Sequence, residues 1–120
     1  MGKQFIKIAA VYFALGALLS VIIGVSGDYS LSRIQSYIHL LGWTALGMIG
    51  LIYVAFPALS VTVLARVHFW LHNIGLPVLV LAIAGKKYGV PDIGVLIIMG
   101  WVLLAAGVVL FMVNVWDRLR

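Results

Sequence analysis

Four apolar stretches, each long enough to cross a lipid bilayer as a helix, occupy most of this chain. A spanning helix needs about 20 mostly apolar residues. With the polar clusters as boundaries, the sequence predicts spans near residues 5–26, 35–56, 60–84 and 93–115. Because 65% of the residues are hydrophobic and 9% are charged, no stretch is left over for a water-soluble domain. We therefore predict one all-α transmembrane domain over residues 1–120, an integral membrane four-helix bundle.

The breaks between these stretches combine turn formers and charges. They are Ser26-Gly27-Asp28, then Phe56-Pro57 with Ser60, and finally the segment from Gly85 to Asp92. Four spans place both termini on one side of the membrane, together with the loop between the second and third spans. Five of the eight basic residues fall on that side and three on the other, so the positive-inside rule predicts cytoplasmic termini. The five are Lys3, Lys7, Arg66, Arg118 and Arg120, against Arg33, Lys86 and Lys87.

Several classes of function are disfavoured by the composition. The chain has no cysteine, which removes disulfides, thiolate metal sites and covalently attached c-type haem. Its net charge of +5 comes from scattered basic residues and not from a patch, so nucleic acid is not an expected partner and membrane lipid is. The three acidic residues, Asp28, Asp92 and Asp117, lie in loops or at the end of a span. The spans therefore hold no carboxylate relay of the kind that proton pumps use.

Small residues recur every four positions in the first span, at Gly16, Ser20 and Gly24. Such a stripe allows two helices to approach closely in lipid. The neighbouring helix can belong to the same chain or to another subunit, and the sequence leaves both interpretations open.

Polar residues inside the spans are the main candidates for function, because the bilayer makes them costly. His68 and His72 are four residues apart and share a face of the third span, with Asn73 and Pro77 close behind. Pro77 cannot donate to the carbonyl of Asn73, so we expect a kink there. The complete set is His39, Arg66, His68, His72, Asn73 and Asn114.

The histidines are candidate haem or metal ligands. Counted from the turn near residues 57–59, His39 lies about 19 residues back and His72 about 14 forward, so their depths differ by about 7–8 Å. An axial pair of His39 and His72 around a b-type haem would therefore require tilted helices. His68 and His72 have the i,i+4 spacing of zinc or copper ligands, but no carboxylate lies nearby to complete the site. Hydrogen bonds across helices are the alternative role for all three.

Two sequence strings resemble a known family. One runs from Leu41-Gly42-Trp43 through Gly50-Leu51-Ile52-Tyr53 to Phe56-Pro57, and the other is His68-Phe69-Trp70-Leu71 followed by Ile74-Gly75. Together they resemble the tenth and eleventh helices of subunit I of the haem-copper oxidases, in the branch of C-family oxidases and nitric-oxide reductases. The likeness covers about 50 residues. The chain is also similar to small four-helix bacterial proteins that carry related strings.

The resemblance does not carry over the usual haem ligation. In the oxidases an H-x-H motif before the L-G-W binds the haems, and the matching positions here are Gln35 and Tyr37. Tyrosine ligates ferric haem in catalase, which keeps Tyr37 as a minor candidate beside His39, His68 and His72. Independent oxidase activity is not expected, because the chain offers no candidates for the copper site or the proton channels.

The resemblance also implies an architecture. Subunit I arranges twelve helices as three four-helix units around a pseudo-threefold axis, and this chain resembles the last unit. A free copy is then expected to form a homo-oligomer, a trimer before a dimer. Three functions stay open: b-type haem binding for electron transfer or gas sensing, a haem-free structural or accessory subunit of a respiratory complex, and a small transporter or channel. The expected location is the bacterial inner membrane.

Overall fold

The computed structural model describes residues 1–119 and is helical throughout. Arg120, one of the basic residues counted above, lies outside the described residues. Within them, four helical segments are long and apolar enough to cross a membrane, which confirms the all-α class and indicates a multi-pass membrane protein. Those segments are Gly2–Ser26, Tyr29–Ala55, Val63–Lys87 and Gly94–Arg118.

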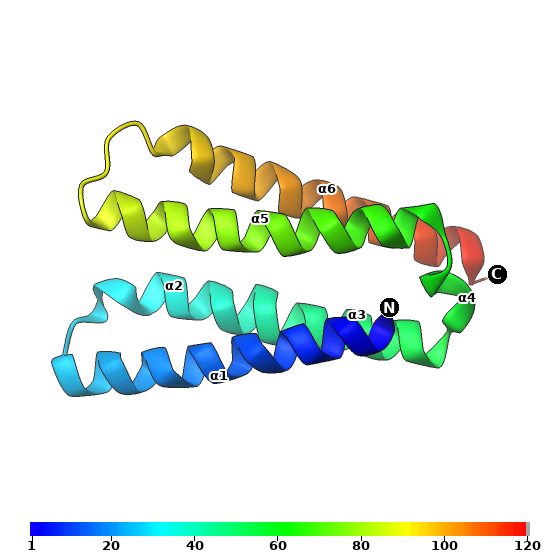
Figure 1. Cartoon of the computed structure of the whole chain (residues 1–120), viewed down its shortest axis with the longest axis horizontal. Coiled ribbons are helices and arrows are strands. Elements are labelled where there is room, and N and C mark those ends of the chain that lie inside the picture. Colours follow the sequence, from blue (N-terminus) through cyan, green and yellow to red (C-terminus); the bar gives the residue numbers. More distant parts are fainter. Residues whose placement is uncertain (120) are drawn as a thin grey trace. The chain divides into compact units, whose positions relative to one another are not determined.

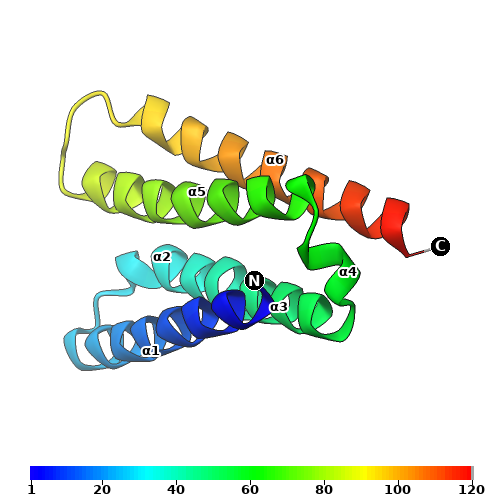
Figure 2. The ribbon, with the colours of Figure 1, turned by 45° about the vertical axis from the view of Figure 1, so that its right-hand side comes forward.

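Contacts between Cα atoms divide the chain into two compact units, Met1–Ile52 and Tyr53–Arg120. We describe each unit by itself. Figure 1 shows an antiparallel pair of long helical segments in each unit, and the two segments of each pair stay next to one another in the turned view of Figure 2.

The first unit begins with α1 (Gly2–Ser26). Gly27 ends this helix in the left-handed conformation, with φ of 70°, and its N–H donates to the carbonyl of Ile23 over 2.9 Å. Glycine adopts this conformation without the Cβ strain that other residues incur, which explains the sharp stop. The next residue, Asp28, accepts a hydrogen bond from the Ser30 N–H and caps the following turn.

The chain returns along α1 through four consecutive pieces of helix. They are the 3₁₀ turn η1 (Tyr29–Leu31), α2 (Ser32–Tyr37), the π-helix η2 (Ile38–Thr44) and α3 (Ala45–Ala55). A π-helix is uncommon and is often found at functional sites. Here it includes His39 and the Gly42-Trp43 pair, which nothing in the apolar pattern had indicated.

The second unit contains the end of α3 from Tyr53, the short α4 (Pro57–Ser60), α5 (Val63–Lys87) and α6 (Gly94–Arg118). Thr62 caps α5, because its hydroxyl accepts a hydrogen bond from the Ala65 N–H over 3.0 Å. α5 and α6 lie antiparallel and in contact (Figure 1).

One detail of α5 differs from the sequence analysis. The helix includes Gly85, Lys86 and Lys87, which we had placed in a loop; lysines are favourable in a last turn because they complement the negative end of the helix dipole. Pro77 lies inside this helix, which continues past it to Lys87. One turn earlier, the Asn73 side-chain amide donates to the carbonyl of Phe69 over 2.7 Å.

Candidate functional site

Five polar side chains of the second unit are buried next to one another. His68, His72 and Asn114 are fully buried, and Thr62 and Tyr53 are nearly so. The five come from α3, the residue that caps α5, α5 itself and α6. We call them the polar chain, after Thr62, Asn114, Tyr53, His68 and His72.

Asn114 holds one end of the polar chain together. Its Nδ2 donates to the carbonyl of Leu59 over 2.9 Å, and its Oδ1 lies 3.0 Å from the Thr62 hydroxyl. That hydroxyl also lies 3.1 Å from the Leu59 carbonyl, so both oxygens compete for its single proton. A further hydrogen bond joins Asn114 to Tyr53. One amide therefore fixes α6 against the α4–α5 turn and the end of α3.

Tyr53 connects this end of the polar chain to the histidines. Its hydroxyl lies 3.3 Å from Nδ1 of His68, and the tautomer of the imidazole decides which group donates. The His68 and His72 rings follow, with centroids 5.5 Å apart and planes at 66°. Phe111 covers both His68 and Tyr53, at centroid distances of 5.4 Å and 5.7 Å. The His68 imidazole thus lies among the rings of Tyr53, Phe111 and His72.

Glycines bring α5 and α6 unusually close together. A Cβ on Gly100 would lie 2.8 Å from the Cα of Leu79, and one on Gly75 would lie 2.9 Å from the Cβ of Leu103. A Cβ on Gly107 would lie 3.2 Å from Cδ2 of His68. These three positions, Gly75, Gly100 and Gly107, form what we call the glycine seam. One edge of the His68 ring lies in this seam, opposite its bond to Tyr53.

His39 belongs to the first unit and has a different environment. Its ring is half-buried and lies over Gly16 of α1, where a Cβ would come within 2.7 Å of its Nε2 and Cε1. The Phe13 ring meets it edge-on, at a centroid distance of 6.2 Å. The imidazole edge that carries Nε2 is therefore directed at α1.

The remaining candidates of the first unit are also within or beside this helix pair. The side-chain amide of Gln35 donates to the hydroxyl of Ser20, which in turn donates to the carbonyl of Gly16 over 2.8 Å. Tyr37 is half-buried. Gly16 and Ser20, two members of the small-residue stripe, thus contact His39 and Gln35 of the returning helical segment inside the unit. Gly24, the third member, has nothing within 4 Å of its Cβ position.

The structure brings together some of the predicted site residues. His68 and His72 are adjacent, whereas His39 and Tyr37 lie in the other unit. Arg66 is exposed on α5. Tyr53 and Thr62 were not among the predicted polar set. Tyr53 was named only as part of the sequence string that resembles the oxidases. Nothing in the sequence marks Thr62 apart from its position before a helix.

In this conformation two of the candidate haem ligands face protein groups. A Cβ on Gly16 would lie 2.7 Å from Nε2 of His39, Nδ1 of His68 lies 3.3 Å from the Tyr53 hydroxyl, and Cδ2 of His68 faces Gly107. For a metal ion, residues 1–119 contain no group of three His, Cys, Asp or Glu side chains close enough to bind it, so His68 and His72 lack a third ligand of these types.

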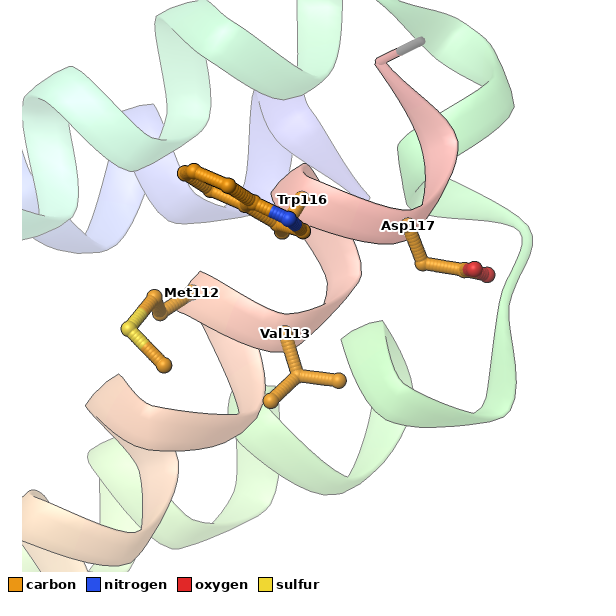
Figure 3. Close-up of a pocket in the computed structure, with 4 residues that line it drawn as sticks. All are labelled: Met112, Val113, Trp116 and Asp117. Atoms are coloured by element: carbon orange, nitrogen blue, oxygen red, sulfur yellow. The ribbon is translucent and has the colours of Figure 1, made fainter.

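A hollow of about 590 Å³ lies at the C-terminal end of α6, lined by Met112, Val113, Trp116 and Asp117. Figure 3 shows Met112 and Trp116 directed away from Val113 and Asp117. The carboxylate of Asp117 lies 3.8 Å from Nε of Arg118. Because one charged group among apolar side chains offers no converging contacts, we do not assign a site here.

The chain matches no family model, no curated protein and no solved structure.

Proposed function

We propose that this protein is a haem-free structural or accessory subunit in a bacterial inner membrane, related to the last four-helix unit of haem-copper oxidase subunit I. One observation supports this most strongly: the His39 and His68 rings are packed against glycines of a neighbouring helix, at Gly16 and Gly107. Polar groups used in this way hold helices together in lipid, where apolar attraction between helices is missing.

The polar chain supports a structural role over a transporter or channel. A path for ions or protons needs polar groups or water along its full length. Beyond His72, the buried residues of α5 are Gly75, Leu76, Leu79 and Ala82, all without polar side chains. The polar chain therefore ends at His72 within α5.

An absorption spectrum of the purified protein tests the haem-free proposal. We expect no Soret band, either as purified from cells supplied with a haem precursor or after incubation with haem and removal of the excess. A Soret band with a sharp reduced α-band would overturn the proposal in favour of the b-type haem alternative. The His39→Ala and His72→Ala variants would then identify the ligand by loss or shift of that band.

Subunit composition is tested by native mass spectrometry from mild detergent. We expect either a homo-oligomer, a trimer before a dimer, or one foreign subunit in fixed ratio, because the proposed role is that of a part in a larger assembly. A lone 13.0 kDa species in several detergents would contradict this. The proposed cytoplasmic location of both termini is tested separately by reporter fusions at residue 120, where activity of a periplasm-dependent reporter would reject it.

A further inference from the structure

An apolar groove of about 310 Å³ lies on the first unit between α1 and the returning helix. Its volume is at the small end of the roughly 300–1,000 Å³ found for ligand pockets. Five of its six lining side chains are apolar or absent, and Thr44 supplies one hydroxyl. The lining residues are Ile6, Trp43, Thr44, Gly47, Met48 and Leu51.

The missing side chain of Gly47 creates the floor of the groove. A Cβ at this position would meet only the Cβ of Ala9, at 3.8 Å, so the two helices are not in tight contact here. On either side they are: a Cβ on Gly50 would lie 2.8 Å from Cγ1 of Ile6 and 2.9 Å from the carbonyl oxygen of Gly2, and the Trp43 ring packs on Phe13 at a centroid distance of 4.6 Å. The groove is therefore a local gap between two close contacts and follows the helix axis.

The groove runs along the helices from the membrane surface toward the membrane interior. Its residues from 43 to 51 cover about 12 Å of helix at about 1.5 Å per residue. The end near Leu51 lies beside the first turn of α1, because Gly50 contacts Gly2. The groove thus begins at a helix end, where a spanning helix meets the headgroups, and continues toward the Trp43 end.

Two exposed lysines lie at the same end. Lys3 and Lys7 are one helical turn apart in α1, and Lys3 is three residues from Ile6, which places it next to the groove lining. Asp28, the acidic residue of the first unit, follows the far end of α1. The open end of an apolar groove thus carries positive charge that no carboxylate of its own unit neutralises.

We infer that this groove is a binding site for an anionic phospholipid. One acyl chain lies in the groove over Gly47, and the phosphate lies at Lys3 and Lys7. Basic residues beside apolar surface at a membrane interface recognise anionic headgroups, and each lysine there contributes roughly a fivefold preference. The inference requires only that the protein span a membrane and does not depend on whether it binds haem.

Native mass spectrometry with a defined lipid mixture tests the site. The protein is released from membranes containing equal amounts of phosphatidylglycerol and phosphatidylcholine, and the lipids that stay bound are counted. We expect the wild type to retain phosphatidylglycerol preferentially. The Lys3→Gln/Lys7→Gln double variant should lose roughly 25-fold of that preference, the product of two fivefold contributions.

A second test of the lipid site fills the groove with a side chain. Gly47→Leu places a side chain where the acyl chain lies without touching backbone, so bound lipid of both types should decrease while helix content stays the same. Gly24→Leu is the matched control, since the Cβ position of Gly24 is open, and it should bind lipid as the wild type does. If Gly47→Leu fails to fold, Gly47→Ala should lower retention in part. Unchanged retention in the filled variant, or an unchanged preference in the lysine variant, would overturn the inference.

Discussion

The two helix pairs have similar composition but hold together in different ways. In the second unit, the glycine seam brings the backbones of α5 and α6 into direct contact, beside the buried polar chain. In the first unit, two glycines lie under aromatic rings: Gly16 under His39, and Gly42 under Tyr12, whose Cγ would be 2.5 Å from an added Cβ; at Gly50 an added Cβ would also meet backbone, the Gly2 carbonyl oxygen. A ring can rotate away from an added atom, whereas a backbone cannot. An added side-chain atom should therefore cost more at Gly100 of the second unit than at Gly16 of the first.

The largest effect is expected for Gly100→Ala in the glycine seam. Its new Cβ would lie within 2.9 Å of the Cα, Cβ and N of Leu79, so the whole helix has to move. We expect a loss of about 3 kcal/mol in the free energy of unfolding, the upper end for overpacking. Unfolding in mixed micelles followed by circular dichroism measures it. Gly94→Ala, where the space is open, is the control in the same helix, and an equal effect in both would show that the seam is not tight.

Asn114→Leu should have the next largest effect, about 1.5 kcal/mol. The change removes the hydrogen bond that Asn114 donates to the Leu59 carbonyl and the one that it accepts from the Thr62 hydroxyl. Polar contacts of this kind in membranes contribute up to about 1.7 kcal/mol. Thr62→Ser keeps the hydroxyl and should remain close to the wild type. If Asn114→Leu were as stable as the wild type in the same unfolding assay, the polar chain would not stabilise the second unit.

Gly16→Ala tests the first unit, and we expect a loss of about 1 kcal/mol, the lower end for overpacking. The added Cβ would come within 2.7 Å of the His39 ring, which can rotate to relieve the contact. In a His39→Ala background the penalty of Gly16→Ala should disappear, which a double-mutant cycle measures. A penalty that persists without the ring would mean that Gly16 meets something other than His39.

Tyr53→Phe should have the smallest effect, about 0.6 kcal/mol, the average for a hydrogen bond between side chains in a membrane protein. The change removes the hydroxyl that lies 3.3 Å from His68 and that also bonds to Asn114, but Asn114 keeps its bonds to Leu59 and Thr62 and the ring stays in contact with Phe111. Tyr29→Phe, at an exposed position, is the control and should be neutral. A loss well above 1 kcal/mol would show that the bonds of the Tyr53 hydroxyl contribute more to stability than this average.

The sequence was a good guide to where the helices lie and a poor guide to their internal contacts. The apolar stretches located four candidate spans, and polarity marked His68, His72 and Asn114, all of which are buried. Tyr53 was not predicted as a buried polar residue, because tyrosine is also common at membrane interfaces and its presence in a span does not by itself indicate burial. Gly100 and Gly107 were missed although their seven-residue spacing, which places them on one face of α6, was a readable signal.

By itself, the sequence determined that the chain is helical and apolar enough to cross a membrane, because length and hydropathy suffice for that. Only the tertiary structure decided which face of each helix meets its neighbour. The physical reason is that these helices are hydrophobic all round, so no polar stripe shows which side is inside. The π-helix at His39, the ring of His39 over Gly16 and the glycine seam all depend on that choice of face, and it is made by close packing between helices.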